Sequence, residues 1–223
     1  MTKEEVKLMQ TTPRVILAIA AEVNDDSIWT QLQTLQAQMF PVGPVNIKLG
    51  YFAREDAANE VRPYVSTRWV DNADDMLDLI DRARDHCVCG CFVTVGDILE
   101  HALQEARDEA IQAIVIIGDR FHGELANVIA CAKQLRALGT RLFVFQQGIG
   151  ADTECAFKRL TEATDGAFFQ FNPHVERIAQ RLPRVLEAIA HYAIGGLPAL
   201  EAQDNEAASL LIEQMNADKQ IAH

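Results

Sequence analysis

The sequence predicts an α/β fold: a three-layer sandwich in which helices cover both faces of a mostly parallel central sheet with one antiparallel edge strand. Segments typical of strands and helices alternate along the chain, as they do where helices connect parallel strands. Several strand segments are apolar at every position, which is typical of strands buried on both faces. Hydrophobic residues make up 49% of the 223 residues, enough for one sizeable core.

The first half of the chain begins this alternation at Arg14. Apolar residues fill the first strand segment, and Asp26 or Ser27 can cap the helix that follows it. No helix separates the second and third strand segments, so one of them is expected to be the antiparallel edge strand. Strands are predicted over 15–20, 45–52 and 66–70, and helices over 26–40 and 71–85.

The second half repeats the pattern and ends in helices. Asp152 or Thr153 is expected to cap one helix, and Pro183 is expected to kink the long helical pattern that starts near residue 174. Gly195, Gly196 and Pro198 are expected to end that pattern. Strands are predicted over 113–118, 141–145 and 167–171, and helices over 98–106, 125–138, 152–164 and 199–220.

Charge and targeting signals narrow the classes of partner. Lys and Arg number 20 against 32 Asp and Glu, a formal net charge of -12. Such a field repels phosphate backbones and anionic lipid heads, so we expect neither nucleic acid nor a membrane as partner. The acidic N-terminus does not resemble a secretory signal, and no apolar run reaches membrane-spanning length. We therefore expect a cytoplasmic protein whose cysteines are reduced.

Oxygen-bearing side chains follow the strand segments. Glu22 and Asn24 follow the first strand, and Asp119 follows the 113–118 strand. Thr94 and Asp97 lie in the loop and helix start between them. If the two strands are neighbours, these side chains meet at one edge of the sheet, where oxygen ligands favour Mg²⁺.

The order of elements resembles the von Willebrand factor type A domain, and more closely a group of small stand-alone bacterial proteins of that superfamily. The resemblance implies a sandwiched sheet over residues 13–196, with a flexible leader over 1–12 and a C-terminal helical tail over 197–223. It rests on the stretches TPRVILAI, STRWV, VGDILEHALQEA, IIGD, FVFQQG, FKRLTEATDGAFFQF and AIAHYAIGGLPALE, and on Trp29.

The resemblance also implies a place for a metal-ion-dependent adhesion site. Such a site needs an Asp-x-Ser-x-Ser turn after the first strand, a Thr from a second loop and an Asp after the fourth strand. The first Asp falls on Ala20, the two Ser fall on Glu22 and Asn24, and the last Asp falls on Asp119. A methyl group thus replaces the indispensable carboxylate.

Two interpretations of this site follow. The Thr position falls on Val93, one residue before Thr94, so a second ligand is also displaced. In the first interpretation the site is degenerate and no cofactor is bound. In the second, Glu22, Asn24 and Asp119 hold Mg²⁺ or Mn²⁺ in a rebuilt geometry, with water at the remaining positions.

A second candidate site is the segment HCVCGC, which holds His86, Cys87, Cys89 and Cys91. Four soft ligands within six residues are compatible with a soft metal or a redox function. Zinc sites, however, usually place pairs of thiolates two to four residues apart in two separate knuckles. Strict alternation also suits an extended segment whose three cysteines lie on one face as small apolar groups.

The sequence therefore favours a non-catalytic protein-interaction or assembly module that needs no metal. The resemblance implies a protein partner, such as an ATPase or a larger assembly, and a homo-oligomer is a further alternative. A Mg²⁺- or Mn²⁺-dependent binding module is the first alternative function. A metal or redox protein that uses Cys87, Cys89 and Cys91 is the second.

Overall fold

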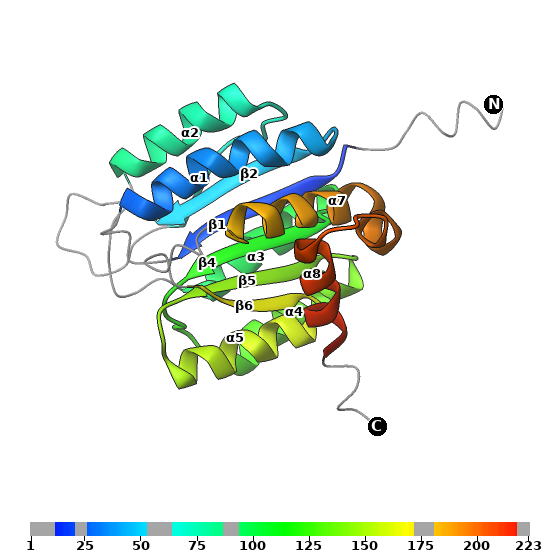
Figure 1. Cartoon of the computed structure of the whole chain (residues 1–223). Coiled ribbons are helices and arrows are strands. Elements are labelled where there is room, and N and C mark those ends of the chain that lie inside the picture. Colours follow the sequence, from blue (N-terminus) through cyan, green and yellow to red (C-terminus); the bar gives the residue numbers. More distant parts are fainter. Residues whose placement is uncertain (1–11, 21–25, 53–63, 87–93, 172–180, 218–223) are drawn as a thin grey trace, which may run out of the picture.

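The computed structural model describes residues 12–20, 26–52, 64–86, 94–171 and 181–217, and shows one sheet between two layers of helices (Figure 1). The strand order is β3-β2-β1-β4-β5-β6; β3 is antiparallel to β2, and the other pairs are parallel. This confirms the predicted sandwich with one antiparallel edge strand. The strands are β1 (Arg14–Ala20), β2 (Asn46–Phe52), β3 (Tyr64–Ser66), β4 (Ala113–Gly118), β5 (Arg141–Gln147) and β6 (Ala167–Phe171).

Seven helices of the described chain, and one short 3-10 helix, cover the sheet. None of these helices is long and apolar enough to cross a membrane. One face carries α1 (Asp26–Met39), η2 (Phe40–Val42), α2 (Ala73–His86), α7 (Arg181–Glu201) and α8 (Glu206–Ala217). The other face carries α3 (Val95–Asp108), α4 (Leu125–Ala137) and α5 (Ala151–Ala163).

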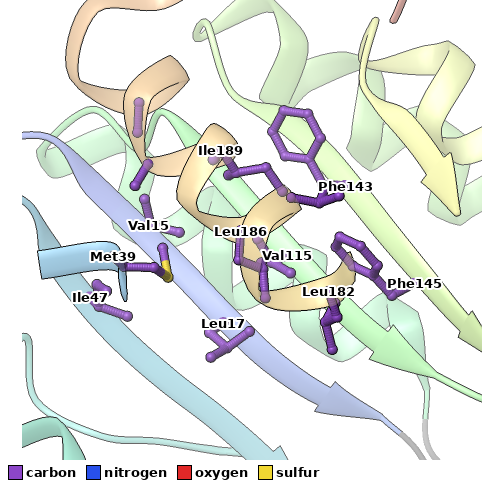
Figure 2. Close-up of a cluster of buried hydrophobic side chains, with 14 of the residues drawn as sticks. Val15, Leu17, Met39, Ile47, Val115, Phe143, Phe145, Leu182, Leu186 and Ile189 are labelled. Carbon is purple, nitrogen blue, oxygen red and sulfur yellow. The ribbon is translucent and has the colours of Figure 1, made fainter. Parts of the chain in front are cut away.

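Strand β1 lies at the centre of both apolar layers. Its residues 15–20 are each at most 2% exposed. Alternate side chains point to opposite faces of a strand, so Val15, Leu17 and Ile19 enter one core cluster. Ile16, Ala18 and Ala20 enter the other. In Figure 2, Val15 and Leu17 lie with side chains of β4, β5 and α7 in the first of these clusters.

Strand β2 is more buried than its alternating sequence indicates. Asn46, Lys48 and Gly50 alternate with apolar residues along the strand, yet helix α3 covers their face and leaves Lys48 only 6% exposed. The ring of Tyr64 takes the space beside Gly50, because a Cβ there would lie 2.0 Å from the Tyr64 hydroxyl. A small residue at 50 therefore allows β3 to pack against β2.

Several element boundaries and caps differ from the sequence predictions. The last helix spans Glu206–Ala217 rather than 199–220. The edge strand spans Tyr64–Ser66 rather than 66–70, and Val70 forms only an isolated bridge with Ile47. Helix α5 begins after Gly150, which has no capping side chain, so neither Asp152 nor Thr153 is the cap. The kink of α7 lies at Gly196 (φ 67°, ψ -160°), not at Pro183. Pro183 falls in the first turn of α7, where no backbone N–H is needed.

The C-terminal segment contributes to the core. The domain boundary at residue 197 stays a prediction, but the apolar residues of α8 face the sheet. Ala208 and Leu211 of α8 are fully buried in the same cluster as Val15 and Leu17, and Met215 is nearly so. Helix α8 packs on α7 and reaches β6. Helix α8 therefore forms part of the core on this face of the sheet.

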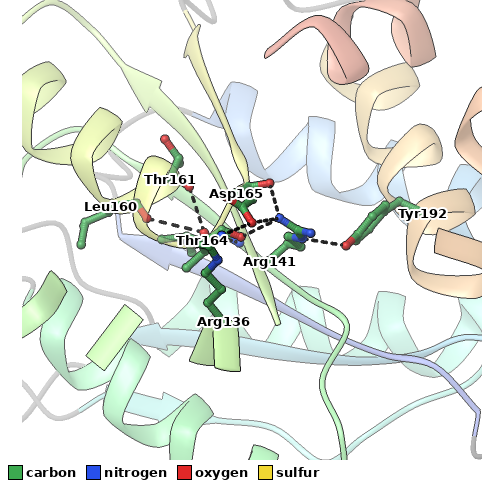
Figure 3. A network of polar contacts seen from close by, with 8 residues as sticks. Arg136, Arg141, Leu160, Thr161, Thr164, Asp165 and Tyr192 are labelled. Carbon is green, nitrogen blue, oxygen red and sulfur yellow. Dashed lines mark hydrogen bonds and ion pairs between the residues drawn. The ribbon is translucent and has the colours of Figure 1, made fainter. Parts of the chain in front are cut away.

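A polar network holds the amino end of β5 to two helices (Figure 3). The Arg141 guanidinium donates to the carbonyl oxygens of Thr164 and Asp165, at 3.1 and 2.9 Å, and to the Tyr192 hydroxyl at 3.0 Å. The Asp165 carboxylate pairs with Arg141 at 2.9 Å and with Arg136 at 2.7 Å. These contacts fix the C-terminal end of α5 and the middle of α7 at the edge opposite the strand carboxyl ends.

The burial of α8 predicts that Leu211→Ala lowers the free energy of unfolding by about 2–4 kcal/mol, because truncation leaves a cavity under the helix. Glu213→Ala, on the exposed side of the same helix, is the matched control and is expected to change it by less than about 0.5 kcal/mol. Urea denaturation of the three proteins measures the difference. Equal midpoints for the wild type and Leu211→Ala would contradict the packing of α8.

Candidate functional site

The carboxyl ends of β1 and β4 lie side by side, as the strand-end hypothesis requires. Ala20 is the register partner of Gly118, and Asp119 follows directly. The Asp119 side chain is 21% exposed, and its Oδ2 lies 3.8 Å from Nε of Arg120. Helix α4 begins only at Leu125, with Glu124 at its cap position, so Asp119 is not the helix cap. Its carboxylate therefore reaches the surface at this edge.

Small residues make the contact between these two strand ends close. The methyl group of Ala20 is 1% exposed and belongs to the core cluster under α3, α4 and α5. A Cβ on Gly118 would lie 3.4 Å from both the Ala20 carbonyl oxygen and the Phe157 ring. The position to which the resemblance assigns the first metal ligand is thus occupied by a buried methyl group.

Thr94 lies at the same edge. Its backbone forms an isolated parallel bridge with His122, which brings the start of α3 beside the loop that follows β4. The Thr94 hydroxyl donates a hydrogen bond to the Asp97 carboxylate. The structure thus brings Thr94 and Asp119 to one edge, as predicted, but the Thr94 hydroxyl is engaged within its own helix start.

The remaining proposed metal ligands, Glu22 and Asn24, lie outside the described residues, as does Val93. Among the residues that are described, no group of three His, Cys, Asp or Glu side chains is placed to hold a metal ion. Asp119 alone does not make up the oxygen set that Mg²⁺ needs. The described part of the edge therefore does not by itself fit a magnesium site.

Cys87, Cys89 and Cys91 also lie outside the described residues, so the soft-metal or redox assignment stays a prediction. His86 is the last residue of α2, and its Nδ1 lies 2.7 Å from the carbonyl oxygen of Arg82. Of the other cysteines, Cys155 is exposed. Cys131 is buried, and burial raises the pKa of its thiol.

The end of β5 adds features that the sequence did not single out. Gln146, the register partner of Gly118, is fully buried. Its amide nitrogen donates to the Gly150 carbonyl oxygen at 3.4 Å, while its Oε1 has no hydrogen-bond partner in the described structure. Gly148, at φ 79°, then turns the chain outward and leaves Ile149 94% exposed. Only the glycines on either side of Ile149 signalled such a turn in the sequence.

A second polar cluster, which sequence reasoning missed, joins β1, β2 and α3. Lys48 donates to the Glu105 carboxylate at 2.5 Å, and Trp69 Nε1 donates to the same group at 3.1 Å. Two cations lie over the Trp69 ring: its centroid is 4.8 Å from the Arg14 guanidinium carbon and 4.9 Å from Lys48 Nζ. Arg14 also pairs with Glu109. The sequence feature that could have indicated this cluster is Lys48, a lysine between apolar residues of a strand.

The surroundings of this cluster shift the pKa values of three groups. Burial raises the pKa of Tyr64, and the charge of Glu105 raises it further. Burial lowers the pKa of His101, Lys48 lowers it again, and Glu105 opposes both. Burial raises the pKa of Glu105, but hydrogen bonds from Lys48 and Trp69, together with the charges of Lys48 and His101, outweigh that effect and lower it overall. The Glu105 carboxylate is therefore held ionised, which suits a structural ion pair.

Comparison with known proteins identifies the fold. No family model matches the chain, and no curated protein is similar to it in sequence. Three of the similar solved structures are the VWA domain of SpRpn10, the proximal thread matrix protein 1 of the mussel byssus with a zinc-occupied MIDAS motif, and a von Willebrand factor type A protein from Catenulispora acidiphila. The chain therefore has a von Willebrand factor A-like fold.

The similarity is one of fold, at low sequence identity. The SpRpn10 domain matches with a TM-score of 0.54 and 13% identity, over 76% of this chain and 93% of that one. The mussel protein matches with a TM-score of 0.57 and 13% identity, over 80% of this chain and 46% of that one. The Catenulispora protein matches with a TM-score of 0.54 and 12% identity, over 82% of this chain and 43% of that one. The chain thus spans nearly all of the first but less than half of the other two.

The Lys48–Glu105 pair predicts an asymmetric response to substitution. Glu105→Gln leaves the buried ammonium group without its counter-charge and is expected to lower the free energy of unfolding by about 3 kcal/mol. The double variant Lys48→Met/Glu105→Leu removes both charges, so we expect it to recover most of that loss. Chemical denaturation of both variants tests this, and a double variant less stable than Glu105→Gln contradicts it.

The lowered pKa of Glu105 also predicts a dependence of stability on pH. Because the pKa is lower in the folded than in the unfolded state, the stabilising contribution is present above the ordinary value of 4.5 and is lost as pH falls through the folded value. The melting temperature of the wild type is expected to fall more steeply below about pH 5 than that of Glu105→Gln. Parallel slopes in thermal melts across this range would refute the assignment.

Proposed function

We propose that this chain is a non-catalytic protein-interaction module that binds its partner without a metal ion. The observation that carries the proposal is Ala20. It occupies the position where the resembling family has its first metal-binding carboxylate, and it is packed in the core beside Gly118. A methyl group supplies no ligand, and its packing leaves the strand ends in direct contact.

The chemistry of the neighbouring groups supports a metal-independent mode. The Asp119 carboxylate faces the Arg120 guanidinium, whose positive charge competes with a cation for the same oxygens. The Thr94 hydroxyl donates its hydrogen to Asp97, and this contact orders the start of α3. A Mg²⁺ ion demands near-ideal octahedral oxygen coordination, so binding here would require both contacts to rearrange.

The proposed partner is another protein, and the proposed contact surface lies at one edge of the sheet. We place the contact surface at the carboxyl edge of the sheet, where the fold gathers several loops and helix starts. A protein partner in the cytoplasm, such as an ATPase or a larger assembly, is proposed ahead of a homo-oligomer. The excess of negative charge argues against nucleic acid and anionic membranes as partners.

Metal independence predicts that millimolar Mg²⁺ or Mn²⁺ leaves the melting temperature equal to that in EDTA, for the wild type and for Asp119→Asn alike. A bound metal would instead stabilise the fold by about 2.7 kcal/mol at a hundredfold excess over its dissociation constant. Differential scanning calorimetry measures the difference.

Two outcomes would replace the proposal. Stabilisation by Mg²⁺ that Asp119→Asn abolishes would favour the rebuilt site of Glu22, Asn24 and Asp119. Stoichiometric metal in anaerobically purified protein, lost in Cys89→Ser, would favour a function for the cysteine segment.

A further inference from the structure

We propose that the surface around Ile149 docks a partner segment in which basic residues flank large apolar side chains. This inference rests on the proposed function and assigns the partner's chemistry to one part of the carboxyl edge. The edge surface is defined by Asp97, Asp119, Glu124, Ile149 and Asp152, which lie at the ends of β4 and β5 and at the starts of α3, α4 and α5.

Ile149 is the apolar centre of the edge surface. In the described structure, only two large hydrophobic residues are exposed to solvent: Ile149, with 94% of its surface accessible, and Leu138, with 42%. Leu138 follows α4 at the opposite edge, just before β5. Ile149 is lifted from the sheet by a turn in which Gly148 has φ 79° and open space where a Cβ would be. Burial of such a side chain by a partner is favourable by the hydrophobic effect alone.

The charges around Ile149 are mainly negative. Asp97, Glu124 and Asp152 are exposed, and Asp119 is partly exposed. Arg120 is the basic residue among them, and it faces Asp119. Acidic residues also stabilise the first turns of helices, so their presence alone does not indicate a binding surface. Their position at the same edge as an exposed isoleucine adds the indication, because charges beside an apolar side chain steer and orient a partner.

Gln146 gives an independent indication that this turn meets a hydrogen-bond donor. Its side chain is fully buried beneath the turn, and its nitrogen contacts the Gly150 carbonyl oxygen. Exchanging the amide nitrogen and oxygen would set two acceptors against each other, so the orientation is fixed by this contact. Its Oε1 is then an acceptor without a donor in the described structure, a costly state that a donor from outside would relieve.

Together these features favour a basic partner segment. A metal-dependent site would instead bind a carboxylate of the partner. The edge surface offers carboxylates, and the unsatisfied Gln146 oxygen lies beneath its turn; all of these groups accept hydrogen bonds. Lysine and arginine side chains carry the matching charge and only donate. A segment with such residues beside large apolar side chains meets both the charged and the apolar part of the surface.

The test selects peptide ligands directly from a random library. Disulfide-cyclised random peptides displayed on phage are selected against the full chain in EDTA, and the enriched peptides are synthesised and titrated by fluorescence anisotropy. The variants are Ile149→Ser, with Leu138→Ser as matched control, and Asp119→Asn/Asp152→Asn, with Asp74→Asn/Asp78→Asn on α2 as matched control. All four change partly or fully exposed side chains, so thermal melts are expected to show intact folds.

We expect the enriched peptides to combine Lys or Arg with large apolar residues. Ile149→Ser is expected to weaken their binding at least about tenfold, and Leu138→Ser less than about twofold. The Asp119→Asn/Asp152→Asn variant is expected to weaken binding and flatten its salt dependence, while the α2 control changes neither.

The inference is overturned if no peptide is enriched, if the enriched peptides are acidic, or if Ile149→Ser binds them as the wild type does. If peptides bind in EDTA and Ile149→Ser does not weaken their binding, only the assignment of this surface is overturned. Enrichment that occurs only when Mg²⁺ replaces EDTA overturns the proposed metal-independent function as well.

Discussion

The burial of β1 and β4 on both faces is the constraint on which the rest of the structure depends. Neither strand can expose a face to water, because every side chain from Val15 to Ala20 and from Ala113 to Ile117 is apolar and buried. The sheet therefore needs a helical layer on each side. The seven described helices divide between the two faces to meet this need, and α8 completes the layer that α7 begins.

This constraint also determines where a partner can reach the molecule. The chain places β2 and β3 on one side of β1, and β4, β5 and β6 on the other. Sheets of this kind bind ligands at the carboxyl ends of the strands, next to the point where the strand order reverses. That point lies between β1 and β4, where Ala20 and Gly118 are register partners. Asp119, Thr94 and the turn that carries Ile149 lie around it.

The sequence predicts these central elements well because apolar runs and helical spacing report burial directly. It predicts the meeting of Thr94 and Asp119 at one edge for the same reason, since strand ends follow from strand order. Prediction from the sequence fails where tertiary contacts decide whether a residue is buried. Lys48 alternates like a solvent-facing residue, and its burial depends on Glu105, 57 positions away.

Other differences arise from short-range signals that neighbouring elements override. Pro183 is a strong helix breaker in a sequence, yet it falls in a first turn, and Gly196 bears the kink instead. Apolar residues are common along α8, and its packing against α7 and β6 decides that Ala208, Leu211 and Met215 form the core face. The exposure of Ile149 has no periodic signature, because it depends on a single glycine turn.

The close fit of Ala20 against Gly118 limits substitution at position 20. A single change that introduced a carboxylate at position 20 would put a charge where a methyl group is packed among core side chains. Without a cation already in place, that charge would be buried and unpaired, and the fold would lose stability before it gained a metal. The strand end therefore tolerates substitution poorly, whereas the exposed turn that carries Ile149 has room for many side chains.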